Sequence, residues 1–321
     1  MTQRRVAVGI AAALFAASAW SLTFLVPAVI GDYSIFDFYL VSFAISGVLS
    51  AGLLILRSKA TRRLKVRDWL VACWLGWIGY LGYSLALTGA TIDAGPVVAS
   101  AFLGMVPVVL GIAGNLRQRT VAWRNLVPPL TLAVAGLFLV NWSNLGRTGA
   151  VRSLRLGTPL AILVVILWTW FGLLNQSALV KRPQISVAIW TALMLGGAAL
   201  GMIAFVPVGL LTGVFEIPRL GLQWKAAAAL YIWSTVLAVV SNIGGALAWT
   251  FASKHLPIAL AAQLITMQPA FGAVLALSIR RQWPTSPESV GMVLLLVGVV
   301  IAVQIFHGER SVWLLPKSRW R

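Results

Sequence analysis

Ten long apolar segments limit this chain to one class of fold. A helix needs about 20 apolar residues to cross a bilayer, and each segment has roughly that length with no charged residue in its middle. Hydrocarbon offers no partner for backbone N–H and C=O groups, so such segments fold there as helices. The pattern predicts an all-α integral membrane protein. Its ten segments are 6–30, 35–56, 69–90, 96–115, 124–142, 158–180, 186–212, 224–251, 257–279 and 289–306.

Composition agrees with a membrane protein. Sixty per cent of the residues are hydrophobic, 10% are charged, and the mean hydropathy is +0.92, which excludes a soluble globular domain. Arg4 and Arg5 precede the first segment as they would in a signal peptide. That segment is too long and lacks a cleavage site, so we interpret it as the first membrane span. The single cysteine, Cys73, cannot form an intrachain disulfide.

The stretch from Tyr83 to Arg119 recurs 162 positions later without a gap. A mid-helix proline with a Met two residues before it is repeated at that offset, as Pro107 and Pro269. We infer an internal duplication with the functional site between the copies. Further matched positions are Leu85/Leu247, Ala86/Ala248, Thr88/Thr250, Ala90/Ala252, Ala99/Ala261, Arg119/Arg281 and Gly136/Gly298. The predicted units are a first five-helix repeat (1–145), a basic linker loop (146–157), a second five-helix repeat (158–308) and a basic, aromatic interfacial tail (309–321).

The basic residues predict the orientation of the spans. With the amino terminus inside, all eleven Lys and Arg residues of 1–142 fall on the cytoplasmic side, as the positive-inside rule requires. The second half is balanced, with seven on each side. Five spans per repeat reverse the second copy, so the halves should be inverted with both termini cytoplasmic. The formal charge of +18 is explained by these loops, and nucleic acid is not an expected partner.

The ionisable residues argue against catalysis. All seven acids and both histidines lie at or near the ends of the segments. A metalloprotease would need His and acidic ligands within a span, and a Ser–His pair cannot be assembled there either. Ionisable side chains at membrane depth are typical of coupled transporters, and none lies in the middle of a predicted span here. We therefore expect no enzyme activity, no metal, no cofactor and no titrating group in the helix interiors.

Uncharged polar and aromatic residues do lie within the spans. A side-chain amide in hydrocarbon costs several kcal/mol without a partner, so such residues should face the protein interior or a wet cavity. Interhelical hydrogen bonding alone is the alternative role for each. The candidate substrate-binding residues are Trp20, Ser21, Tyr80, Tyr83, Trp168, Asn175, Trp190, Asn242, Gln263 and Gln268.

The matched prolines predict two hinges. Pro107 cannot donate a hydrogen bond to the carbonyl of Leu103, and Pro269 cannot donate to that of Ile265. Irregular backbone at membrane depth is tolerated where protein or a cavity satisfies it. We expect the two prolines to face one another near mid-membrane across a central cavity.

These features resemble the drug/metabolite transporter superfamily, specifically its EamA-type exporters with ten spans in two repeats. The resemblance rests on Ala19–Ser21 (AWS) answered by Leu167–Thr169 (LWT), and on Leu85–Ala90 answered by Leu247–Ala252. The two proline helices and the matched Gly136 and Gly298 add to it.

The resemblance implies export or facilitated passage of small organic metabolites, such as amino acids or drug-like aromatic compounds, by alternating access across an inner membrane. Spans one to four and six to nine would line the cavity. Two alternatives stay open: a flippase for lipid or polyprenyl-linked substrates, with a lateral opening, and a non-transporting scaffold subunit with a sealed interior. The expected partners are a small-molecule substrate and membrane lipids, and a homodimer is left open.

Overall fold

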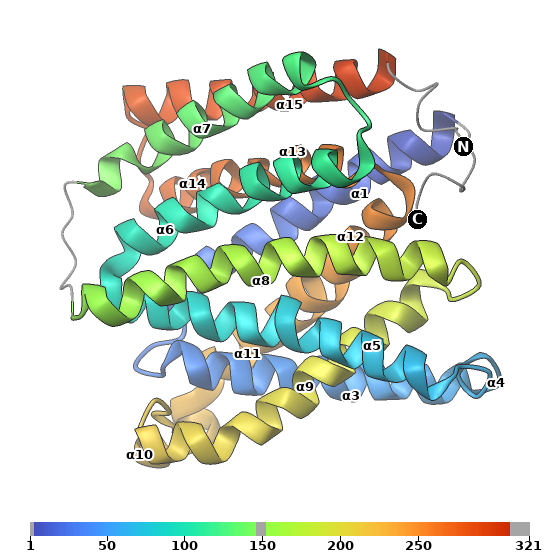
Figure 1. Ribbon diagram of the computed structural model, residues 1–321. Coiled ribbons are helices and arrows are strands. Elements are labelled where there is room, and N and C mark those ends of the chain that lie inside the picture. Colours follow the sequence, from blue (N-terminus) through green and yellow to red (C-terminus); the bar gives the residue numbers. More distant parts are fainter. Residues whose placement is uncertain (1–2, 146–151, 309–321) are drawn as a thin grey trace.

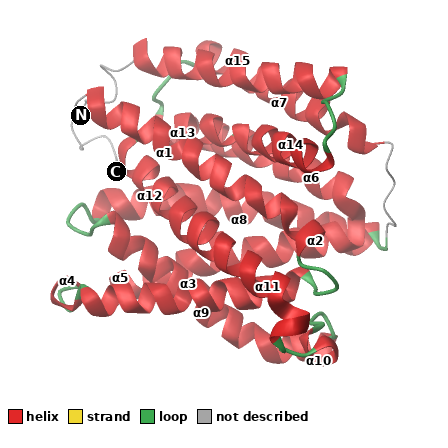
Figure 2. Cartoon of the chain, turned by 180° about the vertical axis from the view of Figure 1, so that it is seen from behind, coloured by secondary structure: helices red, strands yellow, loops and turns green. Residues whose placement is uncertain are grey.

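The computed structural model describes residues 3–145 and 152–308, and every regular element in those ranges is helical (Figure 2). Ten of its helices are long and apolar enough to cross a membrane, which confirms the predicted ten-span all-α fold. The spans lie along one bundle (Figure 1). They are Arg4–Val29, Ile35–Leu56, Val66–Gly95, Val98–Gln118, Trp123–Trp142, Leu154–Lys181, Val187–Thr212, Trp224–His255, Ile258–Ile279 and Ser286–Gly308.

The first span is built from three pieces. Helix α1 (Gln3–Ser21) passes into a 3-10 turn η1 (Leu22–Leu25) and then into the short α2 (Val26–Val29). Pro27, near the start of α2, has no N–H to continue the α-helical pattern, which accounts for the change of helix type. Thr23 Oγ1 donates to the Trp20 carbonyl at 2.7 Å inside the irregular stretch.

Spans two and seven pack side by side as α3 (Ile35–Leu56) and α9 (Val187–Thr212). Each begins at a serine that caps the first turn: Ser34 accepts from the Asp37 N–H, and Ser186 accepts from the Ile189 N–H. The short helices α4 (Ser58–Thr61) and α10 (Ile217–Leu220) follow these spans, one at each end of the bundle (Figure 1).

Spans three and eight share an unusual construction, an α-helix interrupted by a π-helical segment. In span three, α5 (Val66–Gly76) leads through η2 (Trp77–Gly82) into α6 (Tyr83–Gln118). In span eight, α11 (Trp224–Leu237) leads through η3 (Ala238–Gly245) into α12 (Ala246–His255). Shifting η2 by the 162-residue offset places it inside η3. Such π segments are frequent at functional sites.

Spans four and nine also correspond in backbone detail. Helix α6 contains the end of span three and the whole of span four, with a break at Gly95 (φ 86°). Span nine consists of α13 (Ile258–Ile265) and α14 (Met267–Arg280). They end at Arg119 and Arg281, the two non-glycine residues with positive φ (47° and 52°) in the described chain. These arginines are 162 positions apart and lie at opposite ends of the bundle, as inverted copies would place them. The inverted relation of the whole halves remains a prediction.

The remaining spans are α7 (Trp123–Leu145), α8 (Leu154–Lys181) and α15 (Ser286–Gly308). Helices α7 and α15 pair along one side of the bundle (Figure 1). Helix α8 begins at Leu154, so the last four residues of the predicted linker 146–157 are helical. The Gly157 N–H donates to the Ser153 carbonyl at 2.9 Å in this first turn. Residues 146–151 and the tail 309–321 lie outside the described residues.

We call the two ends of the bundle the amino-terminal end and the opposite end. The amino-terminal end holds the start of α1 and the connections 57–65, 119–122 and 182–186. The opposite end holds the connections 30–34, 213–223 and 281–285. The described part of the chain begins and ends at the amino-terminal end (Figure 1), which an even number of spans requires.

Candidate functional site

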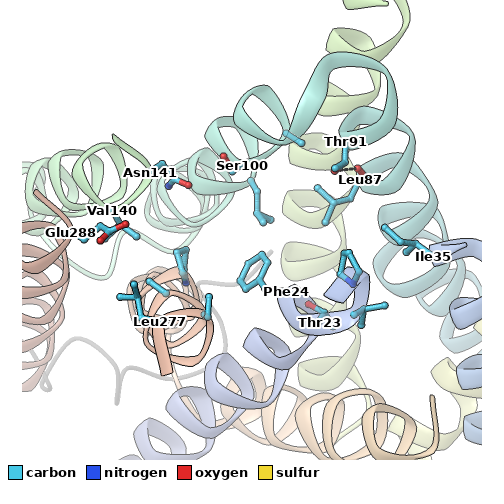
Figure 3. Close-up of a pocket in the computed structure, with 18 of the residues that line it drawn as sticks. Thr23, Phe24, Ile35, Leu87, Thr91, Ser100, Val140, Asn141, Leu277 and Glu288 are labelled. Atoms are coloured by element: carbon cyan, nitrogen blue, oxygen red, sulfur yellow. Dashed lines mark hydrogen bonds between the residues drawn. The ribbon is translucent and has the colours of Figure 1, made fainter. Parts of the chain in front are cut away.

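A cavity of about 460 Å³ opens near the opposite end of the bundle. It lies between η1, α6 and α14, and the ends of α3, α7 and α15 complete its wall (Figure 3). Its lining therefore comes from both halves of the chain. The lining includes Thr23, Phe24, Ile35, Tyr39, Leu87, Thr88, Thr91, Ser100, Leu103, Asn141, Pro269, Gly272, Ala276, Leu277 and Glu288.

Phe24 stands in the middle of this cavity (Figure 3). Its ring packs against Gly272 of α14, where an added Cβ would come within 2.4 Å of the ring. The glycine therefore allows η1 and α14 to approach. Asn141 of α7 and Ser100 of α6 also line the cavity (Figure 3). The cavity is thus an apolar chamber with a few hydroxyl and amide groups on its wall, the usual make-up of a small-molecule site.

The charge of the cavity is slight. Glu288 is the one charged residue among the described lining residues, and it lies at the start of α15. Its carboxylate accepts from the Thr285 N–H at 2.8 Å, which caps the helix. Lys and Arg are absent from this described lining. The described lining consequently offers no cation to an anionic ligand.

A cluster of aromatic rings fills the bundle one helical turn deeper. Trp20 of α1 meets Trp168 of α8 edge to face, with centroids 5.1 Å apart. Trp249 of α12 lies 5.9 Å from Trp20, and Tyr83 of α6 lies 4.9 Å from Trp168. Such offset and edge contacts are the favoured geometry of aromatic pairs. The structure therefore brings together predicted residues from both halves.

The π segments receive aromatic side chains of the opposite half. Trp20 Nε1 donates to the Ser241 carbonyl in η3 at 3.1 Å. Gly245, also in η3, leaves room for this indole, because a Cβ there would lie 2.6 Å from Nε1. In η2, Gly79 leaves room for the ring of Phe171 in the same way, at 2.2 Å.

At the amino-terminal end, two glutamines close the bundle. Gln118 at the end of α6 donates through Nε2 to Gln176 Oε1 of α8, and its own Oε1 accepts from the Ile258 N–H at 3.2 Å. Gln176 Nε2 donates to the carbonyls of Leu256 at 2.7 Å and Ser253 at 3.2 Å. We call Gln118 and Gln176 the amide latch. It ties spans four, six, eight and nine together where the cavity does not reach.

The remaining predicted residues occupy packed positions. Trp190 Nε1 donates to Asn175 Oδ1 at 2.9 Å, and Asn242 Nδ2 donates to Ser46 Oγ at 3.1 Å. The Ser21 hydroxyl donates to the Ser18 carbonyl at 2.6 Å. Gln268 is half-buried.

Several buried polar atoms lack a partner within the described chain. The whole side-chain amide of Gln263 is one, and the Tyr80 hydroxyl, the Trp249 Nε1 and the Asn175 Nδ2 are others. An unpaired buried polar group costs about 1–3 kcal/mol. The interior of the described bundle therefore contains unused hydrogen-bonding capacity.

The two predicted hinge prolines differ in their surroundings. Pro269 lines the cavity, whereas Pro107 does not lie among its lining residues. The helix is interrupted at Thr266, between α13 and α14, and Thr266 Oγ1 donates to the Gln263 carbonyl at 2.6 Å. Helix α6 runs through Pro107 without a comparable break there. Of the two helices that carry the matched prolines, only the one with Pro269 is therefore interrupted near its proline.

Asp37 has a structural role that the sequence did not reveal. It is fully buried at the start of α3 and accepts from the N–H and hydroxyl of Ser34. The same carboxylate accepts from the N–H groups of Glu216 at 3.0 Å and Ile217 at 3.2 Å. Asp37 therefore caps α3 and α10 together and joins span two to the connection between spans seven and eight.

Comparison with known proteins supports membership of a group of membrane proteins. The chain is 28% identical over 308 residues to Inner membrane protein YtfF of Escherichia coli (strain K12), with 92% of this chain and 95% of that protein covered. It is a distant homologue of that protein. A solved crystal structure matches with a TM-score of 0.73 at 16% identity, covering 96% of this chain and 99% of the other, which shows a shared fold. No family model matches the chain.

Proposed function

We propose that this protein is a transporter of the drug/metabolite superfamily, of the EamA type. It moves small organic molecules across the inner membrane by alternating access. The observation that carries the proposal is the unequal state of the two ends of the bundle. A chamber lined by both halves opens at the opposite end, while at the amino-terminal end the amide latch ties spans four, six, eight and nine together. A protein that alternates between two accessible states would have this arrangement in one of them.

The chemistry of the chamber favours a neutral or cationic substrate with an aromatic or aliphatic body. Phe24 supplies a half-exposed ring in the chamber, and Glu288 supplies the one carboxylate of the described lining. An organic cation is attracted to aromatic faces and to a carboxylate. A phosphorylated substrate would find no Lys or Arg among the lining residues that the structure describes.

The aromatic cluster fits this proposal as the floor of the outward chamber. Trp20 and Trp168 come from the first spans of the two halves and meet at the centre. When the amino-terminal end opens, the unpaired groups of Gln263 and Tyr80 would become available to a passing substrate. Gln263 and Tyr80 would then contact the substrate in the state that is open at the amino-terminal end.

Transport by purified protein tests the proposal. Wild-type protein in vesicles is expected to carry radiolabelled aromatic amines and aromatic amino acids down their gradients. Ala276→Trp should abolish this uptake, because Ala276 lines the chamber. Ile279→Trp, on the exposed side of the same helix α14, is the matched control and should leave uptake unchanged. Equal uptake by both variants would exclude the chamber as the path.

The same vesicles separate the alternatives. A flippase would move a fluorescent phospholipid between leaflets and leave soluble amines unmoved. A scaffold subunit would move neither.

A further inference from the structure

A second and larger hollow lies at the amino-terminal end, on the side of the bundle away from the amide latch. Its volume is about 1200 Å³, and it lies between the end of α3, α4, the start of α5, the end of α8 and the start of α9. We call it the basic groove. Six cationic side chains line it: Arg57, Arg63, Lys65, Arg67, Lys181 and Arg182.

Most of this positive charge is unpaired. Asp68 is the one acidic residue lining the groove, and it is bound to Arg182, with Oδ1 at 2.6 Å from Nε. Arg182 is further held over the Trp190 ring, 5.5 Å from its centroid. The other five cations form no ion pair with a carboxylate of the described residues. They converge on one concave surface, where a single anion would reduce the repulsion among them.

The walls of the groove are apolar. Trp74 and Leu174 lie deeper in their spans than the cations and face the groove. Trp74 is 54% exposed and lies seven residues beyond Arg67, which is about 10 Å along a helix. Further apolar lining residues are Leu53, Leu64, Val71, Leu75, Ile185 and Ile189. A cationic rim above an apolar wall matches a molecule with an anionic head and a hydrocarbon tail.

We propose that the basic groove is a binding site for an anionic phospholipid. The phosphate lies against Arg63, Lys65 and Arg67, and an acyl chain runs along Trp74 and Leu174. Basic pockets between membrane spans bind acidic lipid headgroups by this chemistry. The general excess of basic residues in cytoplasmic loops does not by itself produce a hollow or an apolar wall. The basic groove has both, so that excess alone does not explain it. The wall also distinguishes a lipid from a free phosphate compound, which would leave it uncovered.

Native mass spectrometry of delipidated protein tests the site. Wild-type protein should retain phosphatidylglycerol at least about tenfold more tightly than phosphatidylcholine with identical acyl chains, a difference of about 1.4 kcal/mol. The triple variant Arg63→Gln, Lys65→Gln, Arg67→Gln should lose that preference. The control variant Arg5→Gln, Arg117→Gln, Arg124→Gln removes the same charge from exposed positions at the same end and should keep it.

Three results would overturn the proposal. The first is equal retention of the two lipids by wild-type protein, a comparison that needs no variant to fold. The second is equal loss of preference in both triple variants, which would reveal a diffuse attraction to the surface charge. The third is displacement of phosphatidylglycerol from wild-type protein by millimolar inorganic phosphate, together with undiminished lipid binding by a Trp74→Ala variant, which would identify a phosphate site without a tail.

Discussion

The two glutamines of the amide latch are the smallest feature on which the closed end depends. Both are at the ends of their spans, and together they satisfy two backbone carbonyls and one N–H of the neighbouring spans. An interhelical hydrogen bond in a membrane contributes about 0.6 kcal/mol on average. A few such bonds hold the end shut while leaving it easy to open, which suits a gate better than a permanent seal.

Replacing Gln176 with Leu should loosen this end. The carbonyls of Ser253 and Leu256 would lose their donor, and water would be the replacement. In a Cys73→Ser background, a cysteine placed at the buried Ser253 should then react with a maleimide several-fold faster. Gln184→Leu, at an exposed glutamine of the same end, should not change the rate. Unaltered reactivity in Gln176→Leu would remove the latch from the mechanism.

Asp37 illustrates how an acid in a membrane protein can serve structure. Its four hydrogen bonds from N–H and O–H donors join two helix starts. Asp37→Asn would replace an acceptor-only carboxylate with an amide and should lower the free energy of unfolding by about 1–3 kcal/mol.

Uptake per folded molecule should be unchanged in Asp37→Asn, because passage is expected to need no titrating group within the helix interiors. Thermal unfolding and vesicle uptake on the same preparation measure both quantities. A proton-driven accumulation that disappears in this variant at unchanged stability would show that Asp37 couples transport to protons.

At the scale of elements, the irregular segments cluster where the two halves meet. The π segments η2 and η3 contact α8 and α1, the first spans of the opposite halves. The break at Thr266 separates α13 from the cavity-lining α14. Regular helices resist bending, whereas π turns and prolines locally weaken the series of backbone hydrogen bonds that holds a helix straight. Motion between two states would therefore concentrate in spans three, eight and nine.

The two prolines should consequently differ in effect. Pro269→Ala restores an N–H next to the break and should stiffen span nine, raising thermal stability and slowing uptake per folded molecule. Pro107→Ala lies in a helix without a comparable break and should change uptake less. Thermal stability and uptake measured on each purified variant decide this. If both variants transport at the wild-type rate, the hinge hypothesis fails.

At the scale of the whole molecule, the repeated features indicate how the halves are related. Arg119 and Arg281 share a left-handed backbone conformation at opposite ends of the bundle. Two inverted copies with an odd number of spans each would produce this reversal, and we expect the one-sided charge of the first half to orient the whole protein.

The orientation can be tested with single cysteines in the Cys73→Ser background. We expect Gln223→Cys, in the connection before α11, to react with a membrane-impermeant maleimide in intact cells. Ala60→Cys, in the basic connection after α3, should react only after the membrane is opened. The reverse pattern would place the amino-terminal end outside and invert the proposed direction of the chamber.

The sequence by itself determined the ten spans and the recurrence of their local features. Membrane spans follow from length and apolarity over about 20 consecutive residues, so the information is local and the structure reproduces it. Pro27, Gly95 and Pro269 likewise lie at or next to the helix irregularities that the structure shows, because each residue affects the backbone of its own turn. The π segments were not predicted, although the 162-residue offset relates them.

Only the tertiary structure decided which residues form the chamber and which close the other end. The amide latch joins residues 58 positions apart, and Asp37 reaches a partner 179 positions away. Nothing in the local pattern distinguishes Gln118 from a solvated glutamine, or Phe24 from a lipid-facing ring. In a bilayer every apolar face is equally satisfied by lipid or by protein, so periodicity does not say which face is inside. Close packing between distant helices makes that choice.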